Sequence, residues 1–107
     1  MKPRKLKGTH FYTEAGKEIF PGKVTGIMRS NEHDPTTTNI ILSTTNDGDI
    51  TLASNNNYDY IGKWKNKPYE GDIKVKHLTN GKNHALIGEW TDKDGDRGYW
   101  IFQLEEE

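Results

Sequence analysis

The amino-acid sequence predicts a small all-β fold: an antiparallel up-and-down meander of about eight strands that closes into a barrel, with a two-sheet β-sandwich as the alternative. Three observations support this prediction. Apolar residues recur at every second position in short segments, as in half-buried strands. Turn-forming residues separate these segments. Sustained helical spacing is absent, and 11 glycines with many threonines and asparagines disfavour helices.

The expected strands span residues 5–13, 18–30, 39–45, 50–54, 58–66, 71–79, 84–91 and 97–105. A glycine-containing turn at 14–17 ends the first strand. Pro21 and Gly22 interrupt the second strand, which indicates a bulge or a late start. The third and fourth strands flank the turn at 46–49, where Asp-Gly is a strong hairpin signal.

The fifth strand alternates most clearly, because its large rings share one side of the backbone with Gly62. Its Ile-Gly-x-Trp core, residues 61–64, returns in the seventh strand as residues 87–90. We interpret this repeat as a structural unit in which a glycine accommodates a sharp bend or a neighbouring ring. The sixth strand follows the turn at 67–70. The eighth is apolar on both faces at 99–102, which favours closure over an open edge.

A chain of 107 residues fits a single barrel domain, residues 1–107. The chain lacks a helical crossover long enough for a parallel pair, which predicts antiparallel pairing. Eight strands can close and remove their exposed edges. The interior of such a barrel is either filled by side chains or holds one small ligand.

Charge and composition narrow the possible functions. The chain has 15 basic and 16 acidic residues, a balance that disfavours nucleic-acid binding. It has no cysteine, which excludes disulfides and thiolate metal sites. Neither a signal peptide nor an apolar run of about 20 residues is present, so we expect a cytoplasmic protein without a membrane span. A mature secreted form would have the same features.

The sequence offers no catalytic residue, metal site or cofactor motif, and it favours a non-enzymatic protein. The serines lie in no nucleophile elbow, and the four histidines lack metal-ligand spacing. Residues 92–98 resemble the start of a calcium loop. However, Arg97 stands where that loop needs glycine, and Gln103 where it needs glutamate. A hairpin turn explains the segment better.

We predict a binding module that holds a small or partly apolar ligand at the open end of the barrel. The longer connections at 31–38, 55–57 and 80–83 fall at one end and indicate the mouth. The predicted ligand-binding residues, from pocket wall to mouth, are Tyr58, Tyr60, Trp64, Trp90, Trp100, His33 and Asn56, with Glu32 and Asp34 beside His33. The alternatives are a protein-interaction or inhibitor protein that uses its outer surface, and a carbohydrate-binding domain with exposed tryptophans. Either a small-molecule ligand or a protein partner would fit, in a monomer or homodimer.

Most of the chain resembles the calycin superfamily, and within it the avidin family. Residues 7–18 look like the first strand and turn, 23–28 like the second strand, and 88–104 like the closing hairpin. The resemblance implies an eight-stranded barrel. The biotin-site Asn-x-x-x-Ser has no counterpart after Phe11 and Tyr12, so biotin is not implied. Residues 60–71 are also similar to one MORN repeat, which we interpret as shared hairpin chemistry.

Overall fold

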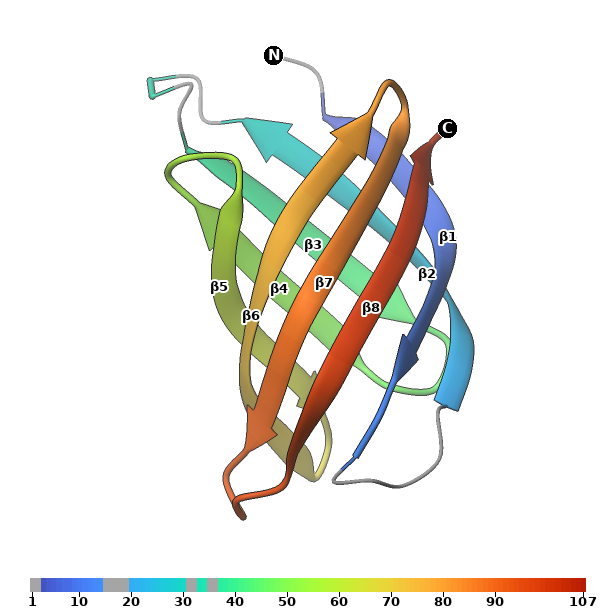
Figure 1. The fold of residues 1–107 in the computed structure, drawn as a ribbon, viewed down its shortest axis with the longest axis vertical. Helices are drawn as coiled ribbons and strands as arrows, with labels where there is room; N and C mark the ends of the chain where they lie inside the picture. The colour runs from blue at the N-terminus through green and yellow to red at the C-terminus, as the bar shows by residue number, and fades with distance from the viewer. Residues whose placement is uncertain (1–2, 15–19, 31–32, 35–36) are drawn as a thin grey trace.

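The computed structural model describes residues 3–14, 20–30, 33, 34 and 37–107. Within these residues the chain forms eight antiparallel strands and no helix, and each strand pairs with the next along the chain (Figure 1). The first strand also pairs with the last, between residues 6–12 and 100–106. The prediction of a closed up-and-down barrel is therefore confirmed, and the sandwich alternative is wrong.

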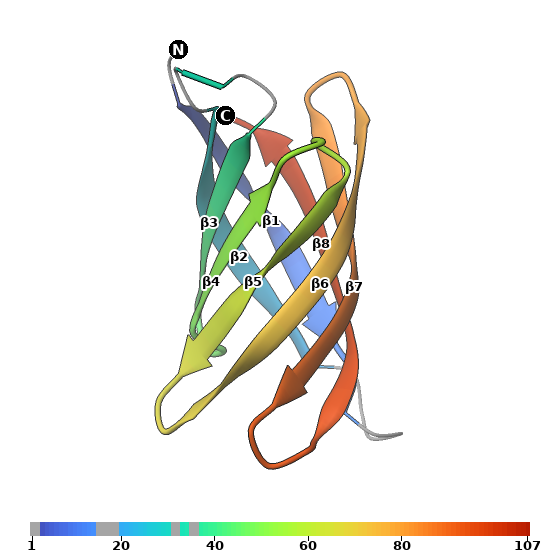
Figure 2. The ribbon, with the colours of Figure 1, turned by 90° about the vertical axis from the view of Figure 1, so that its left-hand side faces the viewer.

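The strands are β1 (Arg4–Tyr12), β2 (Phe20–Ser30), β3 (Thr38–Thr44), β4 (Asp49–Ser54), β5 (Asp59–Asn66), β6 (Tyr69–Asn80), β7 (Asn83–Asp92) and β8 (Arg97–Glu106). They wind steeply around a barrel with extents of 39 × 23 × 22 Å (Figure 2). The expected turn at 14–17 and the expected beginning of the second strand at 18 lie largely outside the described residues. No helix in the described part of the chain is long and apolar enough to span a membrane.

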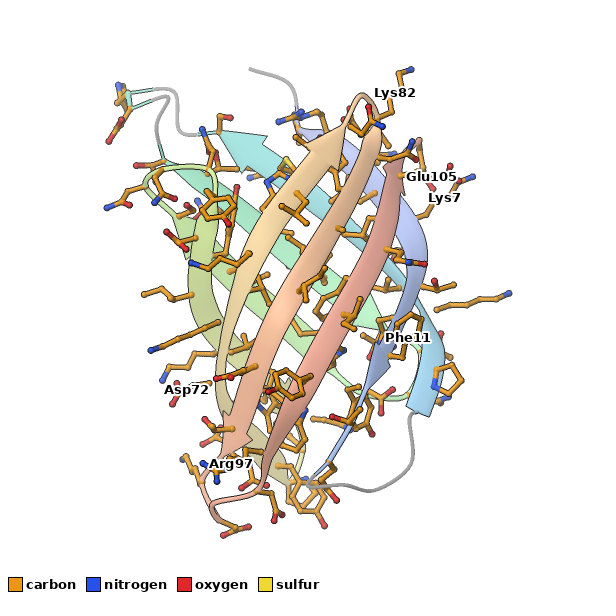
Figure 3. All side chains as sticks on the ribbon, in the orientation of Figure 1. Lys7, Phe11, Asp72, Lys82, Arg97 and Glu105 are labelled. Atoms are coloured by element: carbon orange, nitrogen blue, oxygen red, sulfur yellow. The ribbon has the colours of Figure 1, made fainter. Side chains whose placement is uncertain are left out.

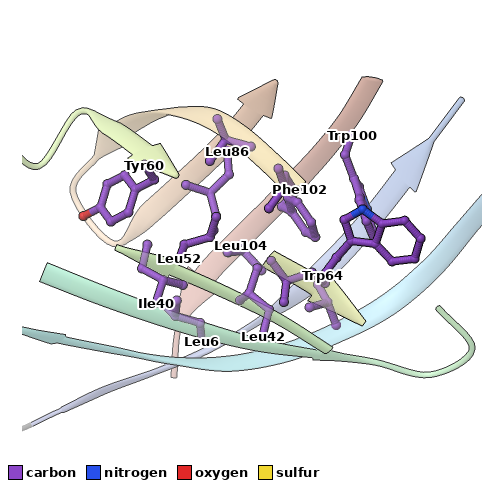
Figure 4. Close-up of a cluster of buried hydrophobic side chains, with 14 of the residues drawn as sticks. Leu6, Ile40, Leu42, Leu52, Tyr60, Trp64, Leu86, Trp100, Phe102 and Leu104 are labelled. Carbon is purple, nitrogen blue, oxygen red and sulfur yellow. The ribbon is translucent and has the colours of Figure 1, made fainter. Parts of the chain in front are cut away.

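The period-2 pattern is the reason for a single closed core. In β3 and β4 the buried and exposed residues alternate without interruption. Figure 4 shows how the inward side chains meet in the middle of the barrel. The buried apolar residues are Leu6, Val24, Met28, Ile40, Leu42, Ile50, Leu52, Tyr60, Trp64, Ile73, Val75, Leu86, Trp90, Trp100, Phe102 and Leu104. Every strand contributes to this list: β1 gives only Leu6, β8 gives three residues, and each of the other strands gives two.

The possible bulge at Pro21 and Gly22 is not present. Both residues pair with β1 in the same continuous register as the rest of β2. The pairing of β2 with β3 starts only at Val24, so the missing N–H of Pro21 costs no bond to β3.

The barrel has two different ends. We call the end with the connections after β1, β3, β5 and β7 the turn end. We call the opposite end, which holds both chain termini and the connections after β2, β4 and β6, the terminus end (Figure 1). The predicted ligand mouth corresponds to the terminus end.

Candidate ligand pocket

Four aromatic rings gather inside the barrel at the turn end. Trp64 and Trp90 meet edge to face with their centroids 5.7 Å apart, and Trp100 lies 6.3 Å from Trp64. Tyr12 completes the group, 5.4 Å from Trp100 and 6.1 Å from Trp90. Tilted and edge-to-face contacts of this kind stabilise aromatic clusters beyond their buried area. The rings come from β1, β5, β7 and β8, so closure of the barrel brings them together.

Glycines on neighbouring strands make room for these rings. Trp64 pairs with Gly71, and Trp90 pairs with Gly98. A Cβ atom on Gly71 would lie 2.7 Å from Trp64 Nε1, and one on Gly98 would lie 2.9 Å from Trp90 Nε1. Each indole therefore occupies the space above a glycine on the next strand, which no larger residue would leave free.

The same two indoles use their N–H groups in the same way. Trp64 Nε1 donates to the Thr91 carbonyl at 2.9 Å, and Trp90 Nε1 donates to the Thr13 carbonyl at 2.9 Å. Each bond crosses the glycine-bearing strand and reaches the segment beyond it. This explains the tryptophan of the Ile-Gly-x-Trp repeat, because in both copies it bridges three neighbouring segments of the barrel.

The third indole is anchored by a buried histidine. Trp100 Nε1 donates to His10 Nδ1 at 3.0 Å. An indole N–H can only donate, so Nδ1 accepts and the neutral imidazole carries its proton on Nε2. Burial lowers the pKa of His10, and the negative charge of Asp47 opposes this effect. Protonation of Nδ1 would also break the bond from Trp100, which further favours the neutral ring.

A cavity of about 350 Å³ lies at this end of the barrel. The described residues that line it are Tyr12, Glu14, Asp47, Trp64, Asn66, Tyr69, Trp90, Asp92, Asp96 and Trp100. Its volume is at the lower limit of pockets that hold small molecules, about 300–1,000 Å³. The lining combines aromatic rings with carboxylates, and it has no lysine or arginine among the described residues.

Asp47 connects the rings to the β3–β4 turn. The Tyr12 hydroxyl donates to Asp47 Oδ1 at 3.0 Å, and His10 Nε2 lies 3.6 Å from Asp47 Oδ2. Burial, the hydrogen bond to Asp47 and nearby negative charge raise the pKa of Tyr12 to about 12. Tyr12 therefore remains a neutral donor at physiological pH and holds the carboxylate at the cavity.

Asp92 also lines the pocket, where β7 ends. Its Oδ1 accepts from the backbone N–H groups of Asp94 and Asp96 at 2.8 and 2.9 Å. These bonds shape the β7–β8 turn, in agreement with the prediction that residues 92–98 form a hairpin turn. Within the described part of the chain, no three histidine, aspartate or glutamate side chains are placed to bind a metal ion.

The terminus end is filled by a different polar network. His77 Nδ1 lies 3.3 Å from the Asn57 carbonyl, His77 Nε2 lies 2.8 Å from His84 Nδ1, and His84 Nε2 lies 2.8 Å from Glu106. These contacts form a histidine chain that runs from the Asn57 carbonyl through both imidazoles to the Glu106 carboxylate.

Two pKa values in this network are shifted. Burial lowers the pKa of His77, and the charges of His84 and Arg4 contribute to the same shift. The hydrogen bond from His84 lowers the pKa of Glu106. Tyr60 packs edge to face on His77, with centroids 5.6 Å apart, so rings and polar groups occupy this end of the interior.

The predicted site residues separate into two groups. Trp64, Trp90 and Trp100 line the cavity at the turn end. Tyr60 also points inward, but it is buried at the terminus end. The expected common wall is therefore divided between the two ends of the barrel, and the pocket lies opposite the expected mouth.

The other predicted residues do not line the interior. Tyr58 precedes β5 and is 47% exposed, with Lys76 Nζ 5.1 Å from its ring. Asn57, at φ 60°, turns the chain just before it, so the alternation of β5 does not extend to Tyr58. His33 is exposed. Asn56 accepts from the backbone N–H groups of Tyr58 and Asp59, so it shapes the β4–β5 connection. Glu32 lies outside the described residues.

The loop at 80–83 borders a hollow, but not an interior one. Asn80 and Asn83 line a concavity of about 550 Å³ on the outer surface, beside β1 and β8. None of the three tryptophans reaches it, so it offers no rigid aromatic surface to a ligand.

Sequence reasoning missed Tyr12 and Asp47 as pocket residues. The signal for Tyr12 was present, because it continues the inward series of Leu6 and His10 along β1. The sequence contained no signal for Asp47 as a pocket residue, because an aspartate in a turn is already explained by turn chemistry.

Comparisons with protein-family models, curated proteins and solved structures found no match.

Proposed function

We propose that this chain is a non-enzymatic binding module that holds a small, partly apolar ligand in the pocket at the turn end. The observation that carries the proposal is the set of three indoles, each fixed by a hydrogen bond to a neighbouring segment, around a cavity of about 350 Å³. Rings that are already fixed lose little conformational entropy when a ligand binds, which favours affinity.

The barrel architecture supports the same proposal. An eight-stranded barrel has an interior just large enough to hold one small ligand. The fold is compatible with a calycin-like barrel, and we include this relationship in the proposal. The resemblance does not extend to biotin, because the sequence that follows Phe11 and Tyr12 lacks that family's Asn-x-x-x-Ser pattern.

A protein partner on the outer surface is the second candidate. Ile61 on β5, Ile87 on β7 and Tyr99 on β8 are 62%, 40% and 59% exposed, and they line the same hollow of the outer surface. Exposed apolar groups that lie together can mark an interaction site. The carbohydrate alternative has less support, because it requires exposed tryptophans and all three are at most 8% exposed.

The pocket proposal can be tested with a larger side chain that fills the cavity. Asn66 lines the cavity, and its amide donates to the Asn46 carbonyl at 3.3 Å. In a fluorescence screen of small amphiphilic compounds, we expect the compounds that bind to change tryptophan emission. Asn66→Phe should weaken their binding at least tenfold. Asn80→Phe, at the terminus end, is the matched control and should bind normally. Hits that respond to Asn80→Phe and not to Asn66→Phe would refute this location, and a screen without hits would favour the outer surface.

A further inference from the structure

We propose that the ligand of this pocket is an organic cation, a small ammonium compound with an apolar group. This inference rests on the proposed function and specifies its ligand class. It follows from what the described lining residues offer a ligand: aromatic rings and carboxylate oxygens, with the N–H groups of the three indoles and the hydroxyl of Tyr12 already engaged.

Four donors of the lining are used within the protein. The three indole N–H groups donate to Thr91, Thr13 and His10. The Tyr12 hydroxyl donates to Asp47. An anionic ligand would therefore meet carboxylates and aromatic faces without a described cationic side chain to compensate its charge.

The charge of Asp47 is not neutralised inside the barrel. Its only ion-pair partner among the described residues is His10, whose Nε2 lies 3.6 Å away. The His10 side chain is fully buried, and its Nε2 makes no hydrogen bond to the described residues. Because Trp100 donates to Nδ1, this ring remains neutral and leaves the negative charge of Asp47 uncompensated.

The aromatic lining adds a second attraction of the same sign. The face of an indole ring is its electron-rich side, and it attracts alkylammonium and other cations within about 6 Å. The edge-to-face arrangement of Trp64 and Trp90 directs rings at different angles around the pocket. Such a set of rings with carboxylates nearby suits a positively charged head group attached to a small apolar body.

Three probes with the same benzene ring and different charges test the inference: phenethylammonium, 2-phenylethanol and phenylacetate. Binding is measured by tryptophan fluorescence and confirmed by calorimetry at low ionic strength. We expect phenethylammonium to bind about tenfold more tightly than 2-phenylethanol, the increment of a partly desolvated cation–π contact. Phenylacetate should bind most weakly. Added salt should weaken the binding of phenethylammonium and leave the binding of 2-phenylethanol unchanged.

Charge-only variants locate the effect. Asp47→Asn and Asp92→Asn keep the side-chain shape. Each should weaken the binding of phenethylammonium severalfold without changing the binding of 2-phenylethanol. Asp72→Asn is the matched control, because Asp72 lies on the outer surface and pairs with Lys63 (Figure 3). It removes the same charge and should have no effect.

The outcomes separate this inference from the proposed function. Equal binding of phenethylammonium and 2-phenylethanol, both sensitive to Asn66→Phe, would overturn the cation preference and keep the pocket. Stronger binding of phenylacetate would also overturn it. If none of the three probes binds and the hits that Asn66→Phe weakens are neutral or anionic, the inference is overturned as well. Binding that Asn66→Phe does not affect would instead overturn the proposed function.

Discussion

Replacing Gly98 by alanine should damage the aromatic cluster without adding any polar group. The new Cβ would lie 2.9 Å from Trp90 Nε1 and would overlap the Thr13 carbonyl oxygen that this nitrogen binds. Either the indole or the segment after β1 must move. The repeat makes the same prediction for Gly71→Ala, whose Cβ would lie 2.7 Å from Trp64 Nε1.

The loss of stability in Gly98→Ala can be estimated from the hydrogen bond between Trp90 and the Thr13 carbonyl that it breaks. A net hydrogen bond contributes about 1 kcal/mol, and a buried donor or acceptor left unpaired costs about 1–3 kcal/mol. We therefore expect Gly98→Ala to lower the free energy of unfolding by about 2–4 kcal/mol. For a domain of this size that corresponds to a fall in Tm of about 10–25 °C.

Urea unfolding followed by circular dichroism and by tryptophan fluorescence measures this loss. Gly81→Ala is the control, because its Cβ would meet no atom within 4 Å and only the left-handed backbone, at φ +63°, adds strain. That strain costs about 1 kcal/mol. In a double-mutant cycle, Trp90→Phe and Gly98→Ala should be less than additive, because both remove the same bond. If Gly98→Ala costs no more than Gly81→Ala, or if the cycle is additive, the account of the repeat is wrong.

Two further predictions concern buried polar groups. Because the pKa of His10 is lowered in the folded state, the unfolded chain binds more protons below about pH 6.5, and stability should fall as the pH drops through that range. His10→Asn keeps an acceptor for Trp100 and should make this fall shallower in urea titrations at several pH values; an unchanged slope would contradict the assignment. Burial raises the pKa of Tyr60, an effect that the Thr38 side chain opposes. The Tyr60 hydroxyl has no well-formed hydrogen bond to the described residues, so Tyr60→Phe should leave the free energy of unfolding within about 1 kcal/mol of the wild type or increase it. A loss of more than 2 kcal/mol, on the scale of a broken buried bond, would show that the hydroxyl has a partner.

The sequence alone determined the strands and their inward faces. Alternation is a local property, since successive side chains of a strand point to opposite sides whatever the strand packs against. It predicted the inward orientation of Trp64, Trp90 and Trp100, and the turn residues predicted where the strands end. It failed at Tyr58, where Asn57 turns the chain and interrupts the alternation.

Only the tertiary structure decided which end of the barrel holds the cavity. Loop length indicated the terminus end, but the interior there is filled by Tyr60 and the histidine chain. At the turn end, Trp64 and Trp90 fit inside the barrel because each pairs with a glycine on the next strand. Closure of β1 against β8 brings His10 to Trp100 across 90 positions of sequence. Such contacts depend on register around the whole barrel, and no local pattern in the chain encodes that register.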